Sequence, residues 1–233
     1  MARPTSFSIA NLKRIVPRIK GKRIGVLGDL MLDRYLWGTA TRLSPEAAVP
    51  VVEFEKQEQF LGGAGNVAAN LAALGVRVEA FGVTGANKGA EDDAGRALRA
   101  CLRDLKIVDR GVVADAGRVT TVKTRIIARH QQVVRLDQES RDALNKETED
   151  KIFRKFTDSV ANLDGLILSD YDKGVISDSL SERVFARSGN CGSRSCSGLG
   201  PRDDGQDADY RSAPADCAAR SREPRRAEQR DRG

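Results

Sequence analysis

The amino-acid sequence predicts an α/β protein. Short apolar or β-branched runs indicate buried strands at 23–28, 76–83 and 165–169. Apolar residues at helical spacing indicate helices between them, at 66–74, 92–104 and 146–161. Because strands that alternate with helices form a mainly parallel sheet covered on both faces, we expect such a sheet at the centre of the molecule. Ligands bind beyond the carboxyl ends of such strands, where Asp29 and Asp170 lie in this sequence.

The bulk composition fits one large α/β domain or two small ones, and it argues against several functional classes. The 233 residues are 40% hydrophobic, which suffices for a sizeable core. The net charge of +6 comes from charges of mixed sign with only 5% aromatic residues, which argues against nucleic-acid binding. The N-terminal region has no long apolar run, so we expect no signal peptide and no membrane span, and a cytoplasmic location. Cys101 is expected to be a buried apolar residue, and no zinc-binding spacing of cysteines is visible.

Two segments do not suit the core of a parallel sheet. Residues 35–60 include the run V-P-V-V-E-F-E, and residues 119–136 alternate strongly between polar and apolar side chains. Both patterns are typical of strands with one solvated or functional face. We therefore expect a small, separate β layer that lies over the ligand-binding end of the sheet.

The composition changes after Arg187. Residues 188–233 contain nine Arg but no Lys, Val, Ile, Phe, Met or Trp. Such a segment buries too little apolar surface to offset its ordering entropy, so we expect it to be disordered. Its composition also resembles a GC-rich gene translated in a wrong frame, and a genuine disordered tail is the alternative. The sequence thus predicts a patterned domain over 1–187 and an out-of-frame tail over 188–233, which resequencing of the gene would test.

The most informative segment is L-G-G-A-G-N-V-A-A-N-L-A-A-L at 61–74. Its glycines, among them Gly62 and Gly63, permit backbone angles and ligand approaches that other residues prevent, and Asn66 is suited to cap the following helix. The spacing also fits a dinucleotide-binding turn. That reading fails because E-K-Q-E-Q precedes the glycines at 55–59, where such a turn requires a buried strand.

Five motifs occur in order along the chain. They are G-D-L-M-L-D-R-Y at 28–35, R-L-S-P-E-A-A-V-P-V-V at 42–52, G-G-A-G-N-V-A-A-N at 62–70, K-T-R-I-I-A-R-H-Q-Q-V-V-R-L-D at 123–137 and L-S-D-Y-D-K-G at 168–174. Together they resemble the ribokinase-like (PfkB) carbohydrate kinases over about residues 9–187. Within that family they look like the D-glycero-β-D-manno-heptose-7-phosphate kinases, the kinase half of bifunctional ADP-heptose synthesis proteins.

The resemblance implies an incomplete ribokinase-like three-layer sandwich with a β-sheet lid. It also implies ATP-dependent phosphorylation of the anomeric oxygen of a heptose 7-phosphate, on the route to the lipopolysaccharide core. Asp29 and Asp33 would accept hydrogen bonds from sugar hydroxyls, and Asn66 would bind neighbouring hydroxyls. Gly62 and Gly63 would form the hinge of lid closure. The structural alternatives are a turn cap for Asp33, a helix cap for Asn66 and an ordinary tight turn for the glycines.

A basic strip is predicted in the 119–136 segment. Lys123, Arg125 and Arg129 are separated by two and four residues, which places them on one face of a strand, where they would bind the phosphate of the sugar. The alternative is a solvated strand face. His130 lies on the opposite face with no acidic partner in the pattern, so we expect a structural role for it.

Asp170 and Lys173 follow the strand at 165–169. They could position sugar or phosphate groups, or could pair with each other.

The catalytic motifs of this family are absent from the printed sequence. The resemblance implies an N-x-x-E motif and a G-A-G-D segment, whose Asp is the catalytic base and whose glycines form the anion hole, and neither occurs. We therefore predict no catalytic residue and no metal ligand here, although ATP and Mg²⁺ are the implied cofactors. The chain is expected to be inactive and poorly folded as it stands, because its sheet would have an uncovered edge after residue 169.

Two other functions remain open at this point. The chain could derive from another PfkB sugar or nucleoside kinase, although the basic strip favours a phosphorylated substrate. It could also be a non-catalytic module that binds a sugar phosphate or forms a homodimer through the lid, with Tyr35, Leu36 and Trp37 in the interface.

Overall fold

The computed structural model describes residues 9–129 and 131–189. The helices are α1 (Ile9–Ile19), α2 (Ala64–Ala73), α3 (Asp93–Asp104), α4 (Lys146–Val160) and α5 (Asp178–Gly189). The strands are β1 (Arg23–Gly28), β2 (Leu30–Leu43), β3 (Pro50–Gly63), β4 (Arg77–Asn87), β5 (Ala90–Glu91), β6 (Val108–Asp115), β7 (Thr121–Ala128), β8 (Gln131–Gln138) and β9 (Gly165–Ser169).

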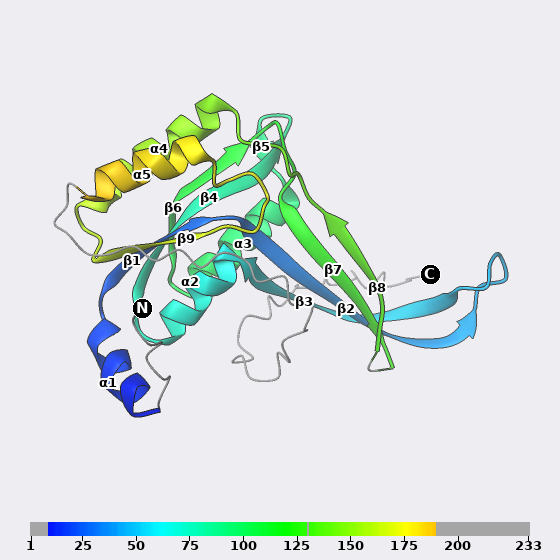
Figure 1. Ribbon diagram of the computed structural model, residues 1–233. Helices are drawn as coiled ribbons and strands as arrows, with labels where there is room; N and C mark the ends of the chain where they lie inside the picture. Colours follow the sequence, from blue (N-terminus) through cyan, green and yellow to red (C-terminus); the bar gives the residue numbers. More distant parts are fainter. Residues whose placement is uncertain (1–8, 130, 190–233) are drawn as a thin grey trace, which may run out of the picture.

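The core sheet is mainly parallel, as the sequence predicts. Strand β1 lies between β4 and β9, β6 pairs with the other side of β4, and the short β5 adds an antiparallel pair to β4. Helices α2 and α3 cover one face and α4 and α5 the other, which gives three layers (Figure 1). The α/β prediction is therefore confirmed, and the three layers agree with the expected sandwich.

Each face of the core sheet has its own hydrophobic core. Leu98 and Leu102 of α3 pack with Val26 of β1 on one face. On the other face Phe81 of β4 meets Phe156 of α4 edge to face, with ring centroids 5.8 Å apart. Full burial of such a side chain stabilises the fold by roughly 1.5–3 kcal/mol. Cys101 is buried in the first cluster, as predicted for a small apolar residue.

The second sheet has the strand order β3-β2-β7-β8 and forms the lid. Its outer pairs are antiparallel hairpins, and β2 pairs with β7 in parallel. The lid extends away from the three layers (Figure 1). It is larger than the predicted 35–60 and 119–136, because β2 and β3 continue into the core at Leu30 and Gly63. Strand β8 is exposed at every residue and hence on both faces, whereas the sequence predicted a strand with one solvated face.

Side chains cap two of the helices at their N-termini. Asp92 accepts a bond from the Gly95 amide at the start of α3, and Asn145 accepts one from the Thr148 amide at the start of α4. The prediction for α2 was wrong: Gly63 is its cap, and Asn66 lies inside the first turn. The chain enters this helix with a positive φ of 55° at Gly63, which favours glycine over asparagine there.

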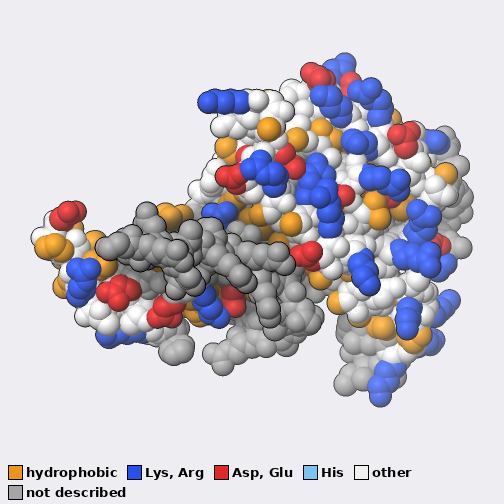
Figure 2. Space-filling view, turned by 180° about the vertical axis from the view of Figure 1, so that it is seen from behind, with side chains coloured by type: hydrophobic (Ala, Val, Ile, Leu, Met, Phe, Trp, Pro, Cys, Tyr) orange, Lys and Arg blue, Asp and Glu red, His pale blue; other side chains and the backbone are white. Residues whose placement is uncertain are grey.

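The predicted tail falls almost wholly outside the described residues. Helix α5 continues through Ser188 to Gly189, two residues past the predicted domain boundary, and residues 190–233 are not described. In the described part, β9 is the outermost strand on its side of the core sheet and is partly exposed. No helix in that part is long and apolar enough to cross a bilayer. Lys and Arg side chains are widespread on the rear surface of the α/β core, mixed with some acidic ones (Figure 2).

Candidate functional site

Asp29 marks the point where the chain passes from the core sheet to the lid sheet. Strand β1 ends one residue before it and β2 begins one residue after it. Its backbone amide donates to the Ser169 carbonyl over 3.1 Å, and its carbonyl accepts from the Ala64 amide over 2.9 Å. Asp29 thus joins the ends of β1 and β9 to the start of α2.

The Asp29 carboxylate is fully engaged within the protein. It is 1% exposed and accepts bonds from the backbone amides of Tyr171, Lys173 and Val175, over 2.7, 3.3 and 3.3 Å. Burial raises the pKa of Asp29 above its usual value, although these three amides lower it. The carboxylate that was predicted to bind sugar hydroxyls therefore holds the 170–175 loop against the sheet.

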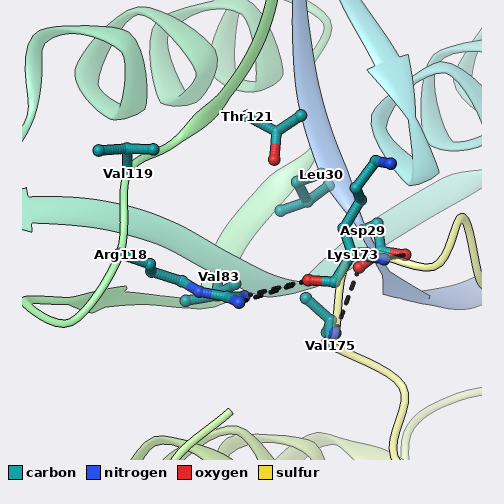
Figure 3. A pocket seen from close by; sticks show the side chains of 8 residues that line it. All are labelled: Asp29, Leu30, Val83, Arg118, Val119, Thr121, Lys173 and Val175. Atoms are coloured by element: carbon teal, nitrogen blue, oxygen red, sulfur yellow. Dashed lines mark hydrogen bonds between the residues drawn. The ribbon is translucent and has the colours of Figure 1, made fainter. Parts of the chain in front are cut away.

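A cavity of about 10 Å³, room for about one water molecule, lies beside Asp29 (Figure 3). Arg118 reaches into it from the loop before β7 and donates to the carbonyls of Lys173 and Asp142. The Thr121 hydroxyl, at the start of β7, points toward the same cavity. Arg118 therefore ties the 170–175 loop to the loop that follows β8.

Lys173 and Asp170 do not pair with each other, which corrects one of the two predicted roles. The Lys173 ammonium lies 3.3 Å from Glu139, and Arg141 donates to the same carboxylate over 2.7 Å. Burial raises the pKa of Glu139, but the bonds from Arg141 and Lys173 outweigh it and lower the pKa. Asp170 is exposed and accepts a bond from the Asp172 amide.

The lid carries a second group of charged residues on one face. Asp33 of β2 stands beside Lys123 of β7, and Tyr35 stands beside Arg125, in the parallel register of these strands. Arg125 donates to the Asp33 carboxylate over 2.5 Å and lies 5.3 Å from the centre of the Tyr35 ring. Burial lowers the pKa of Arg125, but the bond to Asp33 and its charge outweigh this and raise it. We call Asp33, Lys123 and Arg125 the lid face.

The lid face is continuous with the Asp29 cavity. Side chains alternate along a strand, so Thr121, Lys123 and Arg125 project from the same side of β7. Thr121 lines the cavity together with Asp29 and Lys173. The two predicted groups of site residues therefore adjoin at the root of the lid.

The glycine pair lets two carboxylate-bearing segments approach the main chain. A Cβ atom at Gly62 would lie 2.5 Å from Oδ2 of Asp33, and one at Gly63 would lie 2.4 Å from the Asp29 carbonyl. Gly63 also has the positive φ. Both glycines are thus required by close packing, and the predicted hinge role remains a prediction.

Asn66 and Arg129 are placed differently from the predicted pattern. Asn66 lies in the first turn of α2 and accepts a bond from the Asn70 amide group over 3.5 Å. Strand β7 ends at Ala128, and Arg129 follows it with a φ of 49° in the hairpin turn. The prediction that Arg129 continues the basic strip was wrong, because the strand does not reach it. His130 lies outside the described residues.

Sequence reasoning missed Glu139 and Arg118, which fix the loops at the carboxyl end of the core sheet. Glu139 is 34 residues from Lys173, and Arg118 is 55 residues from the carbonyl it binds. No periodic or local spacing could signal contacts at such separations. Within residues 9–129 and 131–189, no group of three or more His, Cys, Asp or Glu side chains is arranged to hold a metal ion.

The fold and the site together define a class. A parallel sheet between helical layers, with an added β lid whose charged face adjoins the carboxyl ends of the strands, is the arrangement of the ribokinase-like carbohydrate kinases. The family model described as pfkB family carbohydrate kinase matches residues 22–196. The chain belongs to this family.

Within this family, the chain is similar to curated proteins of one kind. The chain is 45% identical over 164 residues to the bifunctional protein HldE of Helicobacter pylori strain HPAG1, covering 70% of this chain and 34% of the relative. It is 44% identical over 162 residues to the HldE protein of Desulfatibacillum aliphaticivorans, covering 70% and 32%. The chain therefore spans about a third of the length of these relatives.

A solved structure supports the fold independently. A carbohydrate kinase from Agrobacterium tumefaciens superposes with a TM-score of 0.52 at 21% identity, covering 73% of this chain and 51% of that one. At this identity the likeness concerns the fold alone.

Proposed function

We propose that this chain carries the sugar-phosphate-binding part of a heptose 7-phosphate kinase. The proposal rests on one observation above the others: the lid face combines Lys123 and Arg125 with an acidic hydrogen-bond acceptor, Asp33, next to the carboxyl end of the core sheet. Similarity to the HldE proteins, together with the motifs at 28–35 and 62–70, supports D-glycero-β-D-manno-heptose 7-phosphate as the substrate.

In this proposal the lid-face residues have distinct roles. Asp33 accepts hydrogen bonds from sugar hydroxyls, as carboxylates do, and Asn66 binds a neighbouring hydroxyl. Lys123 and Arg125 bind the 7-phosphate, and the planar guanidinium can bind two of its oxygens. Asp33 already holds the Arg125 side chain in place, so Arg125 loses little conformational entropy when the phosphate binds.

On the core side of the site, we propose that Asp29 positions neighbouring loop residues and does not itself bind the sugar phosphate. Asp29 fixes the loop that bears Asp170 and Lys173; Asp170 is exposed, whereas Lys173 is held by Glu139 and would have to exchange this partner to meet a ligand. Gly62 and Gly63 join β3 to α2 and would serve as the hinge on which the lid closes. Closure would exclude water from the transferring phosphoryl group.

We propose that the described residues do not form the nucleotide and metal sites of the family. Two observations support this: no group of three or more His, Cys, Asp or Glu side chains among them is arranged to hold a metal ion, and the printed sequence has no G-A-G-D segment. ATP, when bound to a complete enzyme of this family, supplies the phosphoryl group. We propose that the chain as printed binds the sugar phosphate in the cytoplasm and does not transfer phosphate to it.

A non-catalytic, dimerising module is the second candidate. The lid bears exposed apolar side chains, with Phe54 66% and Leu136 56% exposed. Tyr35 also meets Phe60 edge to face, with Trp37 stacked beside Tyr35. This candidate predicts a dimer by analytical ultracentrifugation that Leu136→Asp dissociates.

One assay separates these functions. ADP formation is measured with Mg-ATP and either heptose 7-phosphate or fructose 6-phosphate, on this chain and on a version extended with the G-A-G-D segment of a relative. We expect turnover of heptose 7-phosphate by the extended version alone. Turnover by the printed chain would contradict the proposed inactivity, and a preference for fructose 6-phosphate would identify another kinase of the family.

A further inference from the structure

A second cavity lies at the opposite end of the core sheet from the proposed sugar site. It has a volume of about 330 Å³ and is formed where β1, β4 and β6 begin and α4 ends. Its lining includes Arg23, Glu79 and Arg110 from these strands. This volume falls in the range of small-molecule sites, which is about 300–1,000 Å³. We call it the basal cavity.

The floor of the basal cavity contains a buried carboxylate. Glu79 is 5% exposed, and its Oε1 accepts a bond from the Ser159 hydroxyl over 2.8 Å. Among the described residues, no donor bonds to its Oε2. This oxygen is also not completely buried. A buried carboxylate normally has its hydrogen bonds satisfied, so Oε2 is available to a donor in the cavity.

The rim of the basal cavity contains charged side chains that are not paired. Arg23, Arg110, Lys155 and Asp158 line it, all four are exposed, and in the described part of the chain none of their side chains forms a salt bridge or hydrogen bond, so the cations outnumber the one acid. Convergent, unpaired cations around a hollow are suited to an anion, above all a phosphate.

We infer that the basal cavity binds a small phosphorylated sugar or polyol. The three cations bind the phosphate, and Glu79 accepts bonds from its hydroxyls. Inorganic phosphate alone fits less well, because it brings its negative charge to the Glu79 carboxylate without the alcohol hydroxyls of a sugar or polyol, which can lie between the carboxylate and the phosphate. This site is independent of the proposed kinase site, since it shares no residue with the lid face.

The test uses glucose 6-phosphate and inorganic phosphate as probes for the 233-residue chain carrying Lys123→Gln, which weakens the proposed sugar site. Calorimetry measures affinity, and amide chemical shifts locate the binding. We expect saturable binding of glucose 6-phosphate with shifts at 77–79, 108–110 and 155–162, and weaker binding of phosphate.

Arg110→Gln should weaken the binding of glucose 6-phosphate about tenfold, because one charge-assisted hydrogen bond is lost. Arg77→Gln, an equal charge change outside the cavity, is the matched control.

Glu79→Gln gives a result that a folding defect cannot imitate. It should weaken glucose 6-phosphate and strengthen inorganic phosphate, because it removes both the better hydroxyl acceptor and the repelling charge. Four outcomes would each overturn the inference. Two concern binding: no saturable binding of glucose 6-phosphate, or chemical-shift changes confined to 121–125. Two concern the variants: equal effects of Arg77→Gln and Arg110→Gln, or affinities of both probes that change in the same direction in Glu79→Gln. Failure here leaves the proposed kinase site untouched, since that site is tested with Lys123 intact.

Discussion

Asp29 and Asp33 belong to one motif but to two different regions of the molecule. Asp29 lies at the end of the core sheet, 1% exposed, with three backbone amides as donors. Asp33 lies on the lid, 22% exposed, with one arginine as its partner. The same residue type is therefore structural in the core and available to a ligand on the lid. Burial and hydrogen-bond partners, rather than motif membership, separate the two roles.

The largest effect is expected from Asp29→Ala. It would leave three amides of the 170–175 loop without their acceptor, at about 1–3 kcal/mol for each donor that stays buried. We expect the free energy of unfolding in urea to fall by about 4 kcal/mol. Asp33→Ala is the matched control and should lower it by less than about 1 kcal/mol. Equal losses would show that the two regions do not differ.

Gly63→Ala tests the junction between the regions. The new methyl group would meet the Asp29 carbonyl at 2.4 Å, and the backbone would keep a φ of 55°. Strained backbone of this kind costs of order 1–3 kcal/mol, so we expect a loss of about 2–3 kcal/mol in thermal or urea unfolding. Gly89→Ala has a comparable φ of 84° and no atom near its Cβ, and it should cost less. Indistinguishable losses would rule out the close contact as the cause.

Asp33→Asn tests the lid. The amide is a weaker acceptor for hydroxyls and no longer orients Arg125 by charge. We expect heptose 7-phosphate to bind about tenfold more weakly, or about 1.4 kcal/mol, with the unfolding free energy nearly unchanged. Unchanged affinity in titration calorimetry would remove Asp33 from the proposed site.

Arg129→Gln should have the smallest effect. Arg129 lies in the hairpin turn beyond the end of β7, so its removal should change the affinity for heptose 7-phosphate by less than about twofold. Lys123→Gln, an equal change of charge on the lid face, should weaken binding several-fold. A larger effect from Arg129 would restore the three-residue basic strip that the sequence predicted.

The sequence was sufficient where local chemistry decides the structure. Strands β1 and β9 were predicted to the residue, because each is a short apolar run between polar or turn-forming neighbours. The prediction failed at Arg129, where a non-glycine residue takes a positive φ, and at Asn66, where the tertiary junction rather than the cap preference sets the helix start. A positive φ is uncommon outside glycine, so the turn at Arg129 carried no local signal. The start of α2 did carry one, Gly63 with a φ of 55°, but the cap preference of Asn66 competed with it.

The site was predictable in its residue types and not in its connections. The lid pairing of Asp33 with Arg125 spans 92 residues and the loop anchoring by Asp29 spans more than 140. Such contacts depend on strand order, which hydrophobic periodicity does not reveal. The basal cavity was missed for the same reason, since Glu79 and Ser159 are 80 residues apart.

The most direct test of the central claim is a calorimetric titration of the 233-residue chain with D-glycero-β-D-manno-heptose 7-phosphate, beside the same heptose without its phosphate. If the lid face is a sugar-phosphate site, the phosphorylated sugar binds with one-to-one stoichiometry and at least about tenfold more tightly, the contribution expected from charge-assisted bonds to Lys123 and Arg125. Equal affinity for the two sugars, or no binding of either, would contradict the assignment.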